Sequence, residues 1–501
     1  MCIKMRTTGG AKKINSLHLQ IKSPEMKRLL TISAFIILTL AGSSHPWKPS
    51  HYVIVDTDGG IDDMRTLAML LASPDVRLLA VTVSPGALSA DKAYMKVKSL
   101  LNSFRHEGIP VGINRLGSFK SPEFQTALSA VWGSEKGIDA SSAPDFADVI
   151  KEMITAEKTR ISFICLGSMS TAFNSLRSIP EFSNQVKDFI WSADGAEDKA
   201  GFNYNIDVKS SISMIKQEIP VKIVRKYTLD DALFWDNKLL ESVKGINTRY
   251  ARAISSFTGS AGSHRFAVEA TDEMAALFLH YPELFLCRTL GNVSDCTPSD
   301  PDGLRENTLR ILNGETVPRN QVIKEFPADP GFYFDDLSGS VTALIEKYGI
   351  DEFSSCVLSN ELHRHLGVFT VIGVKMGIRA REYFATGVDE FKVRSLAGST
   401  PPISCFNDGI QVSTGATPGH GLLTVVNDQP VKPSAEFTYL NRTVRLTLKP
   451  EYAEKIISEL KEFNFVYGLD SNTYWELVRK NSIKYWLSMD RHEIFDIEVV
   501  K

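Results

Sequence analysis

An apolar run that passes directly into a cluster of aspartates constrains this chain more than any other feature. Residues 52–55 read Tyr-Val-Ile-Val, a β-branched segment typical of a buried strand. Residues 56–63 read Asp-Thr-Asp-Gly-Gly-Ile-Asp-Asp, and from Met64 the apolar residues follow helical spacing. We therefore expect the four carboxylates to lie where a strand turns into a helix, at the strand end where α/β sheets bind ligands.

Carboxylates this close together repel one another, so they need a cation or protons to compensate their charge. Oxygen donors on a glycine-bent loop suit a hard ion such as Ca2+ better than Zn2+. An aspartate beside such an ion could deprotonate a water, which is the core of a metal-assisted hydrolysis site. The alternative is a solvated acidic turn at a helix N-terminus, where Asp is also favourable. The position directly after an apolar strand favours the metal site.

The following residues continue an alternation of strands and helices. Strand patterns cover residues 76–83, 110–113, 161–166 and 189–191, and helical patterns cover 91–104 and 145–156. This alternation predicts an α/β fold with a mostly parallel, open sheet wrapped by helices. We expect this domain to span residues 50–350.

The acidic turn also resembles a known signature. DTDGGIDD is similar to the N-terminal motif of the inosine-uridine-preferring nucleoside hydrolase family. That resemblance implies Ca2+ at the floor of a ribose pocket and hydrolysis of N-glycosidic bonds. It implies Asp58 and Asp63 as calcium ligands, Asp62 as the base that activates the attacking water, and Asp56 as a substrate contact.

Three later segments resemble the same family in the same order. Strand 161–166 with its following loop implies the Leu166 carbonyl as a calcium ligand. FNYNID, residues 202–207, implies that Asn203 contacts the sugar hydroxyls. ATDEMAA, residues 270–276, implies Asp272 as the remaining carboxylate of the metal site. The resemblance predicts a small nucleoside or a related glycoside as the substrate.

The chain departs from the family at three positions that contact sugar or base. Ala87 stands where the family has an Asn for a ribose hydroxyl, Gly201 replaces a Glu, and Thr271 replaces a His. Each lost hydrogen bond to a buried hydroxyl costs about 1–3 kcal/mol. Asp194, Glu197 and Asp198 lie in the loop before Gly201 and offer other contacts. Two functions stay open: hydrolysis of an altered N-glycoside, and a non-catalytic periplasmic protein that binds a metal or another ligand.

A second, smaller α+β domain is expected over residues 355–501. His363, His365 and Cys405 form a nitrogen and sulfur donor set that suits Zn2+ or another transition metal, although scattered histidines and a buried thiol would look the same. HRHLGVFTVIGVKMG and CFNDGIQVSTGATPGHG resemble the FmdE domain, which is named for formylmethanofuran dehydrogenase. The resemblance implies these three residues as metal ligands and no particular reaction. Arg364 stands where the pattern usually has Gly.

The first 44 residues are expected to be an upstream segment and a signal peptide. Residues 26–43 combine a basic start, an apolar run of about thirteen residues and a small-residue cleavage site. That run is too short to span a bilayer. The sequence therefore predicts a periplasmic or secreted protein without a stable membrane anchor, the alternative being an N-terminal tether.

Charge and cysteine content narrow the remaining functions. A net charge of -3 and the absence of a basic block argue against a nucleic-acid partner. After Cys2, five scattered cysteines do not form a disulfide framework, and pairing of Cys287 with Cys296 stays open. The sequence contains no P-loop, dinucleotide fingerprint, GxSxG or HExxH motif. A homo-oligomer is compatible with the sequence.

Overall fold

The computed structural model describes residues 49–117, 119–194, 201–229, 233–260, 269–317, 322–427 and 430–501. Residues 48–501 form one compact unit. The predicted signal peptide and two of the loop acids, Glu197 and Asp198, lie outside the described residues.

An eight-stranded sheet forms the centre of the N-terminal domain, in the order β3-β2-β1-β4-β5-β6-β8-β7. Every neighbouring pair is parallel except β7 and β8. The predicted α/β class with a mostly parallel sheet is thereby confirmed. The chain order reverses at β1, which lies between β2 and β4, and loops at such a reversal open into a crevice. The strands are β1 (His51–Thr57), β2 (Val76–Val83), β3 (Val111–Ile113), β4 (Ile161–Cys165), β5 (Val186–Ser192), β6 (Val221–Val224), β7 (Phe285–Leu290) and β8 (Val293–Pro298).

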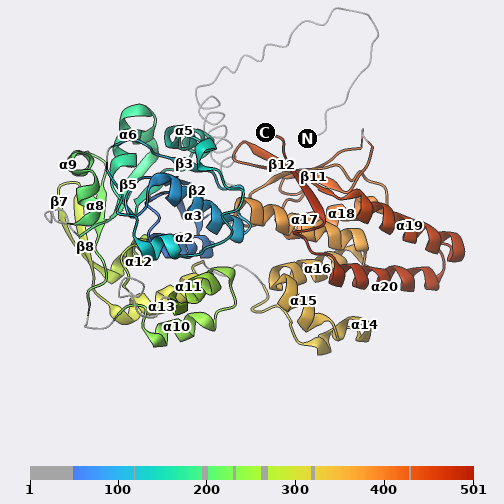
Figure 1. Ribbon diagram of the computed structural model, residues 1–501. Coiled ribbons are helices and arrows are strands. Elements are labelled where there is room, and N and C mark those ends of the chain that lie inside the picture. Colours follow the sequence, from blue (N-terminus) through green and yellow to red (C-terminus); the bar gives the residue numbers. More distant parts are fainter. Residues whose placement is uncertain are drawn as a thin grey trace, which may run out of the picture. The chain divides into compact units, whose positions relative to one another are not determined.

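Helices cover both faces of this sheet (Figure 1). Successive side chains of a strand point to opposite faces, so Val53 and Val55 of β1 join one apolar core while Ile54 joins the other. Burial of both faces explains why the strand is apolar without interruption. The helices of this domain are α2 (Ile61–Ala72), α3 (Ala90–Ser103), α4 (Gln125–Ser129), α5 (Phe146–Ala156), α6 (Ser170–Ser178), α7 (Phe182–Gln185), α8 (Phe202–Ile206), α9 (Val208–Ile215), α10 (Asn237–Lys244), α11 (Arg249–Ser260), α12 (Glu273–His280) and α13 (Pro301–Leu312).

The antiparallel pair at the sheet edge carries the disulfide that the sequence left open. Cys287 of β7 and Cys296 of β8 are directly opposite in the ladder and are bonded to each other. Cys165, Cys356 and Cys405 are free thiols.

The C-terminal domain has its own five-stranded sheet, in the order β10-β9-β11-β12-β13, and is the predicted smaller α+β domain. Helices α17 and α18 pack closely because glycines line their contact: a Cβ at Gly373 would lie 2.1 Å from the Phe406 carbonyl oxygen. The elements are α16 (Ile350–His363), α17 (Val368–Phe384), β9 (Lys392–Ser395), α18 (Phe406–Thr414), β10 (Leu423–Val425), β11 (Ser434–Tyr439), β12 (Arg442–Leu448), α19 (Pro450–Tyr467), α20 (Asn472–Ser488) and β13 (Phe495–Val499).

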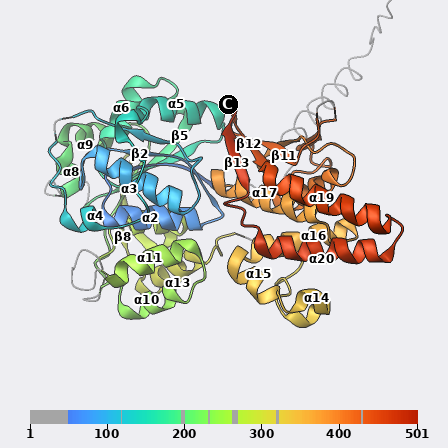
Figure 2. The same cartoon turned by 45° about the vertical axis from the view of Figure 1, so that its right-hand side comes forward.

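The segment that links the two sheets, residues 335–348, packs against the C-terminal domain. Residues of α14 (Asp335–Ser338) and α15 (Val341–Tyr348) share an apolar cluster with Phe353 of α16 and Trp486 of α20. The sequence placed this segment at the end of the first domain, but its apolar side chains are buried against the second. In both ribbon views, α15 lies beside α16 (Figures 1 and 2). Among the described residues, no helix is both long and apolar enough to span a membrane.

Candidate functional site

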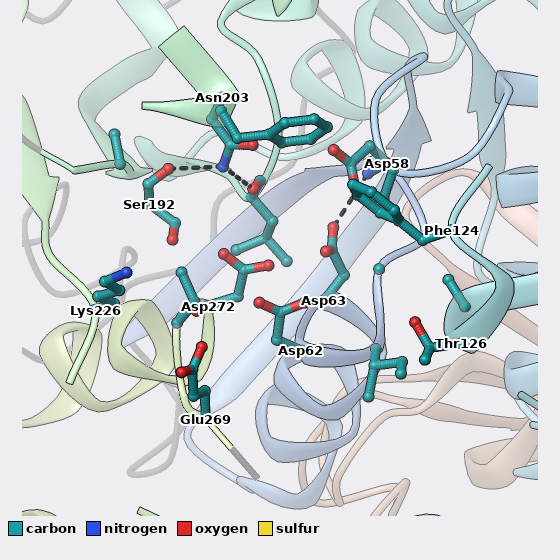
Figure 3. A pocket seen from close by; sticks show the side chains of 18 of the residues that line it. Asp58, Asp62, Asp63, Phe124, Thr126, Ser192, Asn203, Lys226, Glu269 and Asp272 are labelled. Carbon is teal, nitrogen blue, oxygen red and sulfur yellow. Dashed lines mark hydrogen bonds between the residues drawn. The ribbon is translucent and has the colours of Figure 1, made fainter. Parts of the chain in front are cut away.

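A cavity of about 340 Å³ opens where β1, β4 and β5 end (Figure 3). It includes nearly all of the residues that the acidic motif and its later matches predicted. The described residues that line it are Asp58, Gly60, Ile61, Asp62, Asp63, Ala87, Phe124, Thr126, Ala127, Leu166, Ser192, Ala193, Asp194, Phe202, Asn203, Lys226, Glu269, Thr271 and Asp272.

Three carboxylates converge at the floor of this cavity. One oxygen each from Asp62, Asp63 and Asp272 lie within 4.8 Å of one another, close enough to share a metal ion. Asp62 and Asp63 occupy the first turn of α2, and Asp272 directly precedes α12. Figure 3 shows the three side chains facing the same space. The fold therefore brings together three acids that the sequence motifs predicted for one site, although up to 210 residues separate them.

The turn between β1 and α2 fixes the direction of Asp63. Its Oδ1 accepts hydrogen bonds from Thr57 Oγ1 at 2.6 Å and from the Asp58 backbone amide at 3.1 Å. Gly59 has a φ of +80°, a left-handed conformation that other residues adopt only with strain. A Cβ there would also lie 3.0 Å from Ala93 of α3. The backbone conformation and this close approach explain the glycine at position 59.

At the floor of the cavity, burial and mutual repulsion outweigh the one basic side chain, Arg65, that lowers the pKa of Asp62. Burial, and then the charges of Asp63 and Glu273, raise the pKa of Asp62 to about 7. Burial and the neighbouring Asp62 and Asp63 raise the pKa of Asp272 well above its usual range. Asp272 Oδ1 is also buried without a hydrogen-bond partner. A buried carboxylate oxygen without a partner, facing two other carboxylates, fits a hard divalent cation.

Asp58 lies in the same cavity but outside the group of three. Its carboxylate fits between two glycines: a Cβ would approach its Oδ2 to 2.0 Å at Gly86 and to 3.1 Å at Gly167. Backbone amides of Ala87 and Gly60 donate to it, and burial together with the charge of Asp63 raises its pKa. Its assignment as a metal ligand stays a prediction.

Leu166 and Asn203, both predicted for this site, contact each other. Asn203 Nδ2 donates to the Leu166 carbonyl oxygen at 2.6 Å and to the Ser192 carbonyl oxygen at 2.9 Å. A carbonyl oxygen has two lone pairs, so Leu166 keeps one for a cation. The side chain of Asn203 is anchored at the rim of the cavity by the ends of β4 and β5.

Asp56 does not line the cavity, which differs from the expected substrate contact. It is fully buried at the end of β1 and accepts hydrogen bonds from Thr82 Oγ1 at 2.6 Å and Ser84 Oγ at 2.7 Å. Burial raises its pKa to about 7, although hydroxyl hydrogen bonds, including one from Thr171, act against this. Asp56 therefore positions the strand ends around the site instead of touching a ligand.

A buried ion pair supports the acidic group and was missed from the sequence. Arg65 of α2 and Glu273 of α12 are fully buried and paired. Trp235 Nε1 also donates to Glu273 at 3.0 Å, and Arg65 donates to the Glu269 carbonyl oxygen at 2.8 Å. The pair joins α2 to the first turn of α12. The sequence did contain one indication of this pair, because Arg65 interrupts the apolar face of α2 and a buried arginine needs an acidic partner.

In the C-terminal domain, the predicted histidines are close to each other, and one is already engaged. The rings of His363 and His365 are 4.3 Å apart between centroids, and His363 Nδ1 lies 2.7 Å from Asp408 Oδ2. The hydrogen bond with Asp408, and then the neighbouring Cys405, raise the pKa of His363 to about 9, while burial lowers that of His365. Within the described part of the chain, His363, His365 and Cys405 do not bring three ligand atoms within 4.8 Å of one another. His363 Nε2 is buried without a partner, which leaves one donor for a metal.

Arg364, which separates these histidines, has a φ of +68° at the end of α16. This left-handed position explains why the FmdE pattern usually has Gly here, because Gly adopts it without steric cost.

Comparison with known proteins identifies a family for each of the two domains. Residues 53–329 match the model of the inosine-uridine preferring nucleoside hydrolase family, and residues 362–496 match that of FmdE, molybdenum formylmethanofuran dehydrogenase operon. The chain is 23% identical to probable uridine nucleosidase 2 of Oryza sativa subsp. japonica over 46% of this chain and 72% of that protein. It is 22% identical to the pyrimidine-specific ribonucleoside hydrolase RihA of Klebsiella pneumoniae over 34% of this chain and 58% of the relative.

Among solved structures, the purine-preferring ribonucleoside hydrolase from Gardnerella vaginalis is 13% identical and has a TM-score of 0.43, with 53% of this chain and 99% of that chain covered. An inosine-uridine preferring nucleoside hydrolase from Bacillus anthracis is 15% identical, with a TM-score of 0.42, 53% of this chain and 100% of that chain. The family model covers more than half of the residues, in the domain that holds the acidic group. The chain therefore belongs to the inosine-uridine preferring nucleoside hydrolase family and carries a C-terminal FmdE domain.

Proposed function

We propose that the chain hydrolyses the N-glycosidic bond of a ribonucleoside or a closely related N-glycoside, with a divalent cation in the acidic cavity. The observation that carries this proposal is the convergence of Asp62, Asp63 and Asp272, with a buried Asp272 oxygen left without a partner. Ca2+ suits the site best because the donors are all oxygens and Ca2+ accepts six to eight of them. Asp58 and the Leu166 carbonyl oxygen are the further ligands that we propose.

Asp62 has the properties of the general base. It is partly exposed in the cavity while Asp63 and Asp272 are buried, and its pKa is raised to about 7. A base with a pKa near the working pH is the most effective at taking a proton. When bound, the cation supplies Lewis acidity that makes the attacking water easier to deprotonate.

The reaction balances with water as the only co-reactant. The water oxygen forms a bond to the anomeric carbon while its proton passes to Asp62. The bond from that carbon to the base nitrogen breaks, and its electron pair leaves with the base, which takes up a proton. Lys226 is the only basic side chain among the described residues lining the cavity, and its ammonium group is our candidate donor to the leaving base.

The cavity supplies substitutes for some of the replaced sugar contacts. A Cβ at Gly201 would lie 2.7 Å from Asp194 Oδ2, so the Asp194 carboxylate fills the space beside that glycine. We propose that Asp194 takes over contacts made in the family by the Glu that Gly201 replaces. Phe124 and Phe202, with ring centroids 5.6 Å apart, line the same cavity and offer aromatic surface to a base.

A non-catalytic protein that binds a metal or another ligand is the second candidate. Ala87 and Thr271 favour it, because both line the cavity and neither offers the amide or imidazole that the family has there. We also propose that the FmdE domain binds Zn2+ or a similar ion through His363, His365 and Cys405. The chain is proposed to act outside the cytoplasm after removal of the predicted signal peptide.

Assay of the full chain on a panel of ribonucleosides with Ca2+ separates the two candidates. Hydrolysis predicts release of reducing sugar from at least one member, and this release should stop on calcium chelation. Bound calcium without turnover on any member would support the binding-only function. Stabilisation by nucleosides in thermal unfolding identifies the ligand in either case, because a ligand that binds only the native state raises its stability.

A further inference from the structure

A second group of possible metal ligands lies where the strands of the same sheet begin, at the opposite end of β1 from the acidic cavity. His51 is the first residue of β1, Asp75 directly precedes β2, and His280 is the last residue of α12. One ligand atom from each of the three lies within 4.8 Å of the other two. We name this group the amino-edge cluster, because β1 and β2 both begin here.

The backbone around the cluster fixes its residues without an ion. The Ser50 amide donates to Asp75 Oδ1 at 2.7 Å, and the His51 amide donates to the Asp75 carbonyl oxygen at 3.1 Å. His51 is also paired with Val76 in the parallel ladder. His280 ends a helix whose preceding residues, from Met274 to Leu279, are buried in the core. Ligands carried by such rigid elements lose little freedom on binding.

Each histidine of the cluster has one buried nitrogen that lacks the partner that a purely structural role would require. His51 Nδ1 and His280 Nε2 are both buried without a hydrogen-bond partner, and so is Oδ1 of the nearby Asp188 on β5. Buried nitrogens and oxygens normally have such partners. The histidine rings contact each other edge to face at 5.1 Å between centroids, which does not satisfy these atoms.

The distance between His51 and Asp75 is close to that between two ligands of one ion. His51 Nε2 lies 3.7 Å from Asp75 Oδ2, which is longer than a hydrogen bond. Two donors about 2.0–2.1 Å from a tetrahedral zinc ion are about 3.3 Å apart. A movement of a few tenths of an ångström would bring the two atoms to that spacing.

We propose that His51, Asp75 and His280 bind a divalent transition-metal ion of the Zn2+ class, which joins the start of the central strand to the end of α12. Two imidazole nitrogens and one carboxylate oxygen suit such an ion better than Ca2+. Three protein ligands leave a fourth position for water. Because α12 is about 12 Å long and begins beside Asp272, one short helix connects this ion to the acidic cavity.

Zinc binding by the full chain tests the proposal without an activity assay. The double variant His363→Ala/Cys405→Ser serves as the background, because it removes two of the three predicted ligands of the FmdE domain. Saturating Ca2+ keeps the acidic cavity occupied. After removal of transition metals, the background chain should bind one Zn2+ equivalent by elemental analysis, and Zn2+ should raise its thermal unfolding midpoint.

Adding His280→Gln should weaken this zinc binding more than about 100-fold, since even loss of an outer partner of a ligand costs ten- to a hundredfold. His420→Gln, at an exposed histidine outside the cluster, should leave it unchanged. Stabilisation by Ca2+ reports that each variant is folded, and His51→Gln replaces His280→Gln if that variant is not. A background chain that binds no zinc, or folded cluster variants that bind as much as the background, would overturn the proposal.

Discussion

The acidic cavity and the histidine pair of the FmdE domain were both predicted as metal sites, but they differ in how their charges are compensated. Asp62, Asp63 and Asp272 carry the same charge and converge within 4.8 Å, so none of them can neutralise another. His363, in contrast, already has Asp408 as a hydrogen-bond partner and Cys405 as a neighbour. The first group needs a cation or protons from outside, while the second neutralises itself within the domain. Ligands of one charge therefore indicate a required ion more strongly than a mixed set.

The largest effect should come from Asp62→Asn. Loss of the general base should lower the hydrolysis rate by about 10²–10⁴-fold, because proton transfer by a positioned side chain contributes that much. Calcium content should stay at the wild-type level. Asp148→Asn, on the exposed side of α5, is the matched control and should keep the full rate. An Asp62→Asn variant with an unchanged rate would show that another group takes the proton.

Asp272→Asn should lower the calcium affinity by about 100-fold or more, because it replaces a buried carboxylate that has an oxygen free for the ion. The same change should stabilise the calcium-free chain by on the order of 1 kcal/mol at pH 8, since it removes charge repulsion. Calorimetric titration and denaturant unfolding measure the two effects. Asp194→Asn, in the same cavity but outside the group of three, should change the calcium affinity less than about threefold.

Stability of the calcium-free chain should rise as the pH falls from 8 to 5. The folded-state pKa of Asp62 is about 7 and lies above its unfolded value, so the native state binds more protons in this window. Saturating Ca2+ should remove or reverse this slope, because the ion displaces those protons. Unfolding curves at several pH values, with and without Ca2+, provide the measurement. An identical slope in both conditions would contradict our account of the acidic group.

The FmdE domain should show its pH dependence in a different window. The pKa of His363 is raised to about 9 by Asp408 and Cys405, so its contribution to stability is complete below about pH 6.5 and is lost as the pH rises through 9. His363→Gln should flatten the stability profile in that range and also remove a zinc equivalent from the domain. A variant that keeps its zinc would show that His363 is not a ligand.

The smallest effect should come from Ala87→Asn. The new amide would line the cavity where the family has one. It should raise kcat/KM for ribonucleosides by up to about tenfold, because one added hydrogen bond to the substrate contributes about that factor. Kinetics on the same nucleoside panel would detect it. A fall in kcat/KM would mean that this chain uses the space beside Ala87 for a different substrate.

The sequence predicted the elements more completely than their contacts. Continuous apolar runs such as 52–55 identified the buried strands, and the order of motifs identified the residues that meet in the cavity. The sequence assigned Asp56 to the substrate because it belongs to the acidic motif, and only the structure shows the hydroxyl groups that surround it. The Arg65 and Glu273 pair joins residues 208 apart, and no local pattern indicates such a contact.

The most direct test is a crystal structure of the chain grown with calcium and a ribonucleoside. Our account predicts one ion about 2.3–2.6 Å from carboxylate oxygens of Asp63 and Asp272, with the sugar above it and Asp62 beside the attacking water. Asp62, Asp63 and Asp272 turned away from one another around a site without an ion, at saturating calcium, would contradict it.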